Sequence, residues 1–255
     1  MKPASKFSKS RLPGRYIGVD GCPAGWFAVW QIAQPEGLRA GHATLEKSIG
    51  YAVFKDIAEL MAELADARRI LIDMPIGLKV DAPRQLESQL RKLLGKKRSS
   101  VFPVPARSAV YATSYEQACR LNVSAFGKKL SKQSWNICAK IQQVDQHLIK
   151  HPVRRDKLLE SHPELAFQRL AGMELEHGKK TKSGIKERLK ILAQHNAALP
   201  SLYSDILDAT RRADVARDDI LDAMALMLSA LNCKQLAFEP EHGFDSIPIR
   251  MSTFI

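Results

Sequence analysis

Short apolar segments separated by turn residues dominate the first 80 positions of the chain. Such segments predict buried strands, because successive side chains of a strand point to opposite faces of a sheet. The predicted strands are RYIGVDG (15–21), GWFAVWQIA (25–33), the more loosely alternating segment 38–51, and the apolar run that ends at Asp73 (68–73). Between the last two, apolar residues recur at helical spacing over FKDIAELMAELADA (54–67). This order predicts an antiparallel meander of three strands, then a helical crossover to a parallel strand.

Helical periodicity dominates the rest of the chain. The predicted elements are helices over 81–95 and 131–150, a strand and a helix within 156–172, a helix after Gly184, and a strongly apolar helix over 217–233. We therefore predict an α/β fold in which helices flank a mixed sheet. One domain is expected over residues 15–255, with a helical basic insertion at about 80–150 and a disordered basic arm at 1–14.

Positive charge is concentrated in the middle of the chain. The net charge is +12, and residues 79–190 hold 24 Lys and Arg against 10 Asp and Glu, so the remainder is slightly acidic. A localised basic excess favours a polyanionic partner, nucleic acid first. The alternative interpretation is a solvated basic surface without a ligand.

Composition and the N-terminal sequence indicate the cellular compartment in which the protein is expected. The sequence has no apolar run long enough for a membrane span, and its basic N-terminus lacks the apolar core of a secretory signal. Four cysteines show no C-x-x-C pairing and are expected to be reduced thiols. We therefore expect a cytoplasmic protein without membrane contacts. The sequence predicts no particular protein partner, and a homodimer is one of the assemblies that it allows.

Acidic residues stand at the ends of several predicted elements. Asp20 and Asp73 end two of the predicted strands, and Asp219 and Asp222 lie three residues apart on the late helix. Carboxylates at the ends of neighbouring strands come close in space, and a helix on the sheet can add two more. Their mutual repulsion is relieved by a hard divalent cation, so the pattern indicates Mg²⁺ or Mn²⁺. Each acid also has a simpler interpretation, as a turn residue or as a favourable charge in the first turn of a helix.

Two further carboxylates flank a predicted strand end in the segment ESHPE. We assign Glu160 as a candidate metal ligand and Glu164 as a candidate catalytic acid, and whether either joins the site is left open.

Seven segments resemble the family known as domain of unknown function 429. They are IGVDGCPAGW, LIDMPIGL, RSSVFPVPAR, SKQSWNICAKIQQVD, LLESHPELAF, KKTKSGIKERLKIL and DDILDAMAL, in this order over about residues 15–235. The family is described as predicted nucleases of ribonuclease H-like fold. The resemblance implies a ribonuclease H-like mixed sheet whose acidic site is formed by Asp20, Asp73, Asp219 and Asp222. DDILDAMAL also resembles the last acidic helix of Holliday-junction resolvases, which generally carry Glu where this chain has Asp73.

The function expected from these features is phosphodiester hydrolysis of DNA or RNA at a two-metal carboxylate site. Basic, hydroxyl and amide side chains of the middle segment would hold the nucleic acid. The candidates are Arg91, Lys97, Arg98, Ser99, Ser100, Arg107, Lys128, Gln133, Lys140, Lys180 and Lys182. Phe102 could stack on a base or anchor its loop, whereas Trp26 opens an apolar strand and is expected in the core.

Two other functions fit the same sequence features. One is a nucleotide-binding phosphotransferase of the actin-like and sugar-kinase type, since GVDGCPAGW loosely resembles its first phosphate turn. A second such turn is expected in that duplicated fold and is not found. The other is a nucleic-acid-binding protein without catalytic activity.

Overall fold

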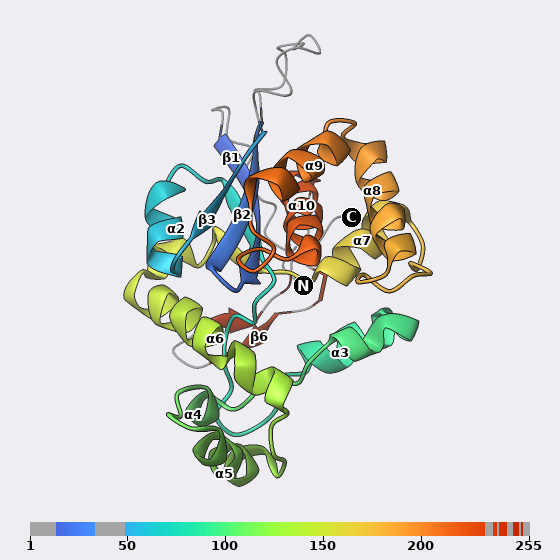
Figure 1. Cartoon of the computed structure of the whole chain (residues 1–255). Coiled ribbons are helices and arrows are strands. Elements are labelled where there is room, and N and C mark those ends of the chain that lie inside the picture. Colours follow the sequence, from blue (N-terminus) through green and yellow to red (C-terminus); the bar gives the residue numbers. More distant parts are fainter. Residues whose placement is uncertain are drawn as a thin grey trace, which may run out of the picture. The chain divides into compact units, whose positions relative to one another are not determined.

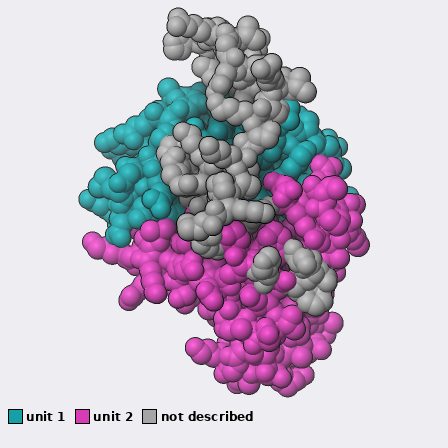
Figure 2. Space-filling view, turned by 180° about the vertical axis from the view of Figure 1, so that it is seen from behind, with its two compact units in different colours: residues 1–73, 157–236, 252–255 teal, residues 74–156, 237–251 magenta. Residues whose placement is uncertain are grey.

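The computed structural model describes residues 14–33, 49–232, 237–238, 240–243, 247–249 and 251. The predicted arm, apart from Gly14, and residues 38–48 of the predicted third strand lie outside this part of the chain. The chain divides into two compact units, distinguished in Figure 2. Unit 1 comprises residues 1–73, 157–236 and 252–255, and unit 2 comprises residues 74–156 and 237–251.

Unit 1 contains a five-stranded mixed sheet of order β3-β2-β1-β4-β5 (Figure 1). Its strands are β1 (Gly14–Cys22), β2 (Gly25–Ala33), β3 (Ile49–Phe54), β4 (Arg69–Ile72) and β5 (Leu158–Glu160). The pairs β1–β2 and β2–β3 are antiparallel, whereas β4 runs parallel to both β1 and β5. The predicted α/β fold, with three antiparallel strands followed by parallel strands, is confirmed at this level.

The turn between β1 and β2 depends on a glycine. It consists of Pro23 and Ala24, after which Gly25 has a φ of +136°. A Cβ atom at Gly25 would lie 2.1 Å from the carbonyl oxygen of Phe54. Any other residue would therefore combine a disfavoured backbone conformation with a steric clash. Trp26, the next residue, is fully buried, which confirms its predicted place in the core.

Helices flank the sheet of unit 1. They are α2 (Ile57–Glu63), α7 (Pro163–Ala171), α8 (Lys182–His195), α9 (Leu199–Ala209) and α10 (Arg217–Asn232). Figure 1 shows α2 on one side of the sheet and α7 to α10 on the other. The apolar helix α10 packs across β1, β2 and β4 and also contacts α7, α8 and α9. It is buried along almost its whole length, as its continuous apolar sequence predicts.

A glycine in β1 lets α10 approach the sheet closely. A Cβ atom at Gly18 would lie 2.0 Å from the carbonyl oxygen of Ala223 and 2.3 Å from the amide nitrogen of Met227. The backbone of α10 therefore rests directly on β1. This contact places the first turns of α10 beside the end of β1.

Unit 2 is mainly helical. Its elements are α3 (Leu86–Leu93), η2 (Gly95–Ser100), α4 (Arg107–Val110), α5 (Tyr115–Phe126), α6 (Lys132–Lys150), η3 (Pro152–Arg154), and the paired strands β6 (Glu241–His242) and β7 (Pro248–Ile249). The hydroxyls of Ser114 and Ser131 cap α5 and α6 by accepting hydrogen bonds from backbone N–H groups. The predicted insertion at about 80–150 falls within residues 74–156. None of the helices in the described ranges combines the length and apolar character needed to span a bilayer.

Candidate metal centre

Three aspartates from three elements of unit 1 converge at one end of the sheet. Asp20 lies near the end of β1, Asp73 directly follows β4, and Asp222 lies on α10. One carboxylate oxygen from each of the three residues lies within 4.8 Å of the others. Asp20 and Asp222 are buried, and Asp73 is partly buried. Three of the acids predicted from the sequence are thus brought together.

The register of the parallel strands explains the pairing of the first two aspartates. Val19 pairs with Ile72, and the N–H of Asp73 donates a hydrogen bond to the carbonyl oxygen of Val19. Asp20 and Asp73 are each one residue further along, so their side chains lie side by side on the face opposite to that of Val19 and Ile72. This is also the face of Gly18, where α10 packs, so Asp222 meets both.

Burial and repulsion shape the electrostatics of the three carboxyls. Burial, together with the charges of Asp222 and other nearby acids, raises the pKa of Asp73 to about 7. The pKa of Asp20 is also raised, by burial and then by the charges of Asp73 and Asp222. Ionisation of all three carboxyls is therefore unfavourable unless positive charge lies close to their oxygens. Hard oxygen ligands in such a cluster suit a divalent cation such as Mg²⁺ or Mn²⁺.

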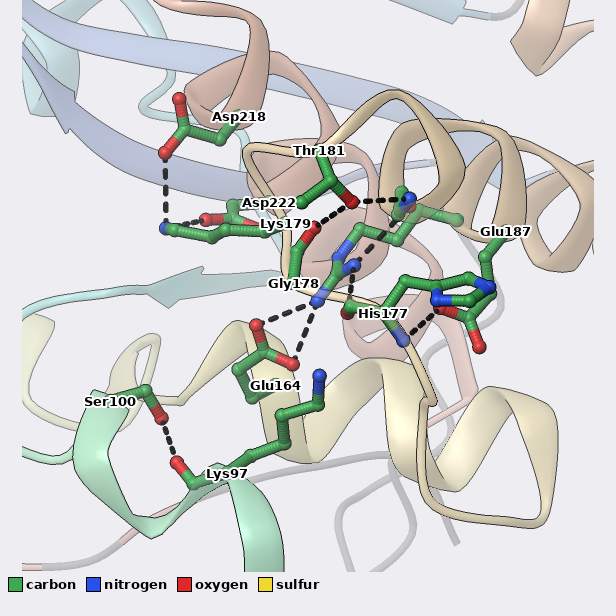
Figure 3. Close-up of polar contacts among 12 residues, drawn as sticks. Lys97, Ser100, Glu164, His177, Gly178, Lys179, Thr181, Glu187, Asp218 and Asp222 are labelled. Atoms are coloured by element: carbon green, nitrogen blue, oxygen red, sulfur yellow. Dashed lines mark hydrogen bonds and ion pairs between the residues drawn. The ribbon is translucent and has the colours of Figure 1, made fainter.

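A lysine lies directly against this cluster. Lys179 Nζ is 2.7 Å from Asp222 Oδ2 and 3.4 Å from Asp218 Oδ2 (Figure 3). Burial alone would lower the pKa of Lys179, but the charges of Asp222 and Asp20 outweigh that effect and raise it. Lys179 is therefore a charged partner of the site.

Lys179 was not predicted as a site residue from the sequence, although the neighbouring Lys180 and Lys182 were. Lysines 179, 180 and 182 surround the N-terminus of α8, where the helix dipole disfavours positive charge. This unfavourable placement of positive charge is the sequence feature that could have marked all three lysines as candidate site residues. Lys180 and Lys182 are exposed, whereas Lys179 is partly buried.

The other acids of α10 lie at the rim of the triad. Asp219 Oδ2 accepts a hydrogen bond of 2.9 Å from the N–H of Ala216, so one of its oxygens caps the helix. Burial raises the pKa of Asp219, the Ala216 N–H opposes this, and the charges of Asp218 and Asp222 add to it, with a net value of about 6. Asp219 therefore influences the triad through its charge and lies outside the group of three oxygens.

Glu160 and Glu164 have different surroundings from the three aspartates. Glu160 pairs with Ile72 across β4 and β5, so strand alternation assigns it to the face of Ile72. Both oxygens of Glu164 accept hydrogen bonds from Arg188 Nη2, at 2.7 and 2.9 Å. Each glutamate raises the pKa of Asp73 through its charge. Neither belongs to the group of three converging oxygens.

Most of the predicted nucleic-acid contacts lie in unit 2. Arg91 donates two hydrogen bonds to the carbonyl oxygen of Val101, and Arg107 forms an ion pair with Asp145. The Ser100 hydroxyl donates to the carbonyl oxygen of Lys97. Arg98, Ser99, Lys128 and Gln133 are exposed, whereas Lys97 and Lys140 are partly buried.

Removing one site carboxylate should stabilise the metal-free protein. A carboxyl whose pKa is raised on folding binds a proton more tightly in the folded state, so stability falls as pH rises from about 4 to about 7. Asp73→Asn removes that penalty. Its melting temperature in EDTA should exceed that of the native protein by about 2–5 °C at pH 8 and by less at pH 5. Asp205→Asn, at an exposed site on α9, is the matched control. An equal gain at both pH values would contradict the electrostatic explanation.

One known protein family matches the chain over a range that includes this site. The family described as protein of unknown function DUF429 matches residues 18–240. The chain belongs to this family. The matched range includes every acid of the centre and Lys179, so the site lies within the part of the chain that defines DUF429 membership. No curated protein and no solved structure matches the chain. The matched family is described only as a protein of unknown function, so the nuclease activity expected from the resemblance has to be argued from the chemistry of the site.

Proposed function

We propose that this DUF429 protein is a nuclease of ribonuclease H-like fold that depends on Mg²⁺ or Mn²⁺. The observation that carries the proposal is the convergence of Asp20, Asp73 and Asp222, each of which offers a carboxylate oxygen within 4.8 Å of the other two. A divalent cation held by such oxygens acts as a Lewis acid and neutralises charge that develops on phosphate oxygens.

The fold and the charge distribution support a nucleic-acid substrate. The mixed sheet has the three antiparallel and two parallel strands expected of a ribonuclease H-like core, with acids at the ends of β1 and β4. The excess of Lys and Arg over residues 79–190 supplies positive charge for a phosphate backbone. Lys180 and Lys182 are exposed within the same unit as the triad and are the first candidates for phosphate contacts.

The residues of the centre would have different roles. Asp20, Asp73 and Asp222 would hold the cation, because one oxygen of each converges on the same place, and Asp20 and Asp222 are buried. Asp219 adds negative charge at the rim while it caps α10. Glu164 is held by Arg188 and therefore stabilises the packing of α7 against α8.

The test is a panel of labelled single- and double-stranded DNA and RNA together with a four-way junction. Each substrate is incubated with protein and Mg²⁺, Mn²⁺ or EDTA. Cleavage should require the metal and should be lost in Asp73→Asn, whereas Asp205→Asn should cleave like the native protein. Cleavage that persists in EDTA, or in Asp73→Asn, would contradict the proposal.

The same panel separates the other functions. Binding of ATP without an effect of nucleic acid would favour a phosphotransferase. That function is not favoured by the fold, because the described residues contain one five-stranded sheet and no second copy of it. Tight nucleic-acid binding without cleavage of any substrate, in either metal, would indicate a binding protein and overturn the proposed activity.

A further inference from the structure

The loop that carries Lys179 is fastened to α8 by charged side chains. Glu187 accepts hydrogen bonds from the N–H groups of Glu176 and His177, at 2.8 and 3.0 Å. Figure 3 shows the contact with His177. Burial opposes ionisation of Glu187, but these two N–H groups lower its pKa, so its charge is favoured. Arg188, which has no exposed surface, donates weakly to the carbonyl oxygen of His177 while it binds Glu164. Both helix residues therefore fix the backbone just before Lys179.

The other end of the loop is equally constrained. The N–H and the hydroxyl of Thr181 both donate to the carbonyl oxygen of Gly178, at 3.0 and 2.9 Å. The same hydroxyl accepts from the N–H of Gly184 and so caps α8. Lys179 lies inside this closed turn, so its backbone is held on both sides. A lysine on a surface loop ordinarily has a freely moving side chain, whereas this one starts from a fixed position and reaches Asp222.

The position of Lys179 suits a permanent cation of the site. Its side chain is 35% exposed, whereas that of Asp222 is 2% exposed, so the ammonium group reaches the buried carboxylate from the rim. The contact with Asp218 places the ammonium group between two carboxylates of α10 that lie four residues apart. A second metal ion bound by Asp222 and its neighbours on α10 would have to compete with this ammonium group.

The contacts of Lys179 then limit the number of metal ions. Its ammonium group lies 2.7 Å from Asp222 Oδ2 and 3.4 Å from Asp218 Oδ2, so it already supplies positive charge at the oxygens where a second divalent cation would bind. We propose that Lys179 is built into the centre as its second cation, so that this chain binds a single Mg²⁺ or Mn²⁺ where a two-metal site would bind two. This inference rests on the proposed function, because it takes the triad to be a metal site.

The experiment counts Mn²⁺ ions per chain by electron paramagnetic resonance of free Mn²⁺, with isothermal titration calorimetry as a second measurement. The native protein should bind one ion at the centre. Lys179→Met, which keeps an unbranched side chain one atom shorter and removes the charge, should bind two. Lys179→Arg keeps the charge and should bind one. Lys186→Met removes an exposed lysine of α8 and is the matched control, also expected to bind one.

The outcomes distinguish this inference from the proposed function. Two ions per chain in the native protein would overturn the role of Lys179 even if Lys179→Met failed to fold, and the triad would remain a metal site. One ion in a folded Lys179→Met protein, as judged by circular dichroism, would overturn it as well. Mn²⁺ binding that is absent, or that survives Asp20→Asn, would instead refute the metal site itself.

A substitution that changes no charged residue tests the same inference. A Cβ atom at Gly184 would lie 2.0 Å from the carbonyl oxygen of Gly178, so Gly184→Ala should push the loop away from α8. Lys179 would then lose its fixed starting point, and the variant should bind a second Mn²⁺ ion as Lys179→Met does. Ser183→Ala, at the exposed neighbouring position, is the control and should bind one ion. A folded Gly184→Ala protein with one ion would show that the loop does not position Lys179.

Discussion

Asp20→Asn is expected to abolish Mn²⁺ binding at the centre and to lower phosphodiester cleavage by at least about 1000-fold, the scale seen when a dominant electrostatic contribution to a transition state is lost. Asp20 Oδ1 accepts a hydrogen bond of 2.7 Å from the N–H of Gly21. The amide oxygen of asparagine can accept the same bond, so the local turn should survive the change. What disappears is one negative charge and one strong oxygen ligand.

The stability of the same variant separates loss of charge from loss of structure. Burial and the charges of Asp73 and Asp222 raise the pKa of Asp20, so its ionised form disfavours folding when no metal is bound. Asp20→Asn in EDTA at pH 8 should therefore melt at or above the temperature of the native protein, and added Mn²⁺ should no longer raise it. Undiminished cleavage by a folded Asp20→Asn protein would refute the site.

Strands β1, β2, β4 and β5 could be predicted because each is a local apolar pattern bounded by turn residues. The predicted third strand (38–51) shares only residues 49–51 with β3 (Ile49–Phe54), and Phe54 was predicted to begin the following helix. Asp20 and Asp73 were recognisable because each follows an apolar strand and parallel neighbours end at one edge of a sheet. Asp222 was recognisable as a carboxylate within an otherwise apolar helix, where an uncompensated charge is costly. The family resemblance is confirmed by the match over residues 18–240.

The partners of these acids could not be predicted because tertiary contacts set them. Glu164 and Arg188 are 24 residues apart, and no local pattern marks them as an ion pair. The face of Glu160 depends on its pairing with Ile72, and a register shifted by one residue would reverse it. Lys179 reaches an acid 43 positions later in the chain. Sequence periodicity shows which element a residue belongs to, and it does not show what approaches from another element.

Substitution of Gly18, the residue of β1 on which α10 packs, is expected to have the second large effect. The atoms that a Cβ atom at Gly18 would meet, the oxygen of Ala223 and the nitrogen of Met227, belong to the helix backbone. Side-chain rotation cannot relieve such a clash, so the helix has to move. Gly18→Ala should lower the free energy of unfolding by about 3 kcal/mol, as measured by urea denaturation.

The displacement of α10 should also separate Asp222 from Asp20, because both positions depend on the same contact with β1. Mn²⁺ binding should therefore fall together with stability in Gly18→Ala, although no charged residue has changed. Gly14→Ala is the control on the same strand, because its Cβ atom would meet the flexible side chain of Arg68. It should cost less than about 1 kcal/mol and leave Mn²⁺ binding intact. If Gly18→Ala kept both its stability and its Mn²⁺ binding, the close approach of α10 to β1 would not be what assembles the centre.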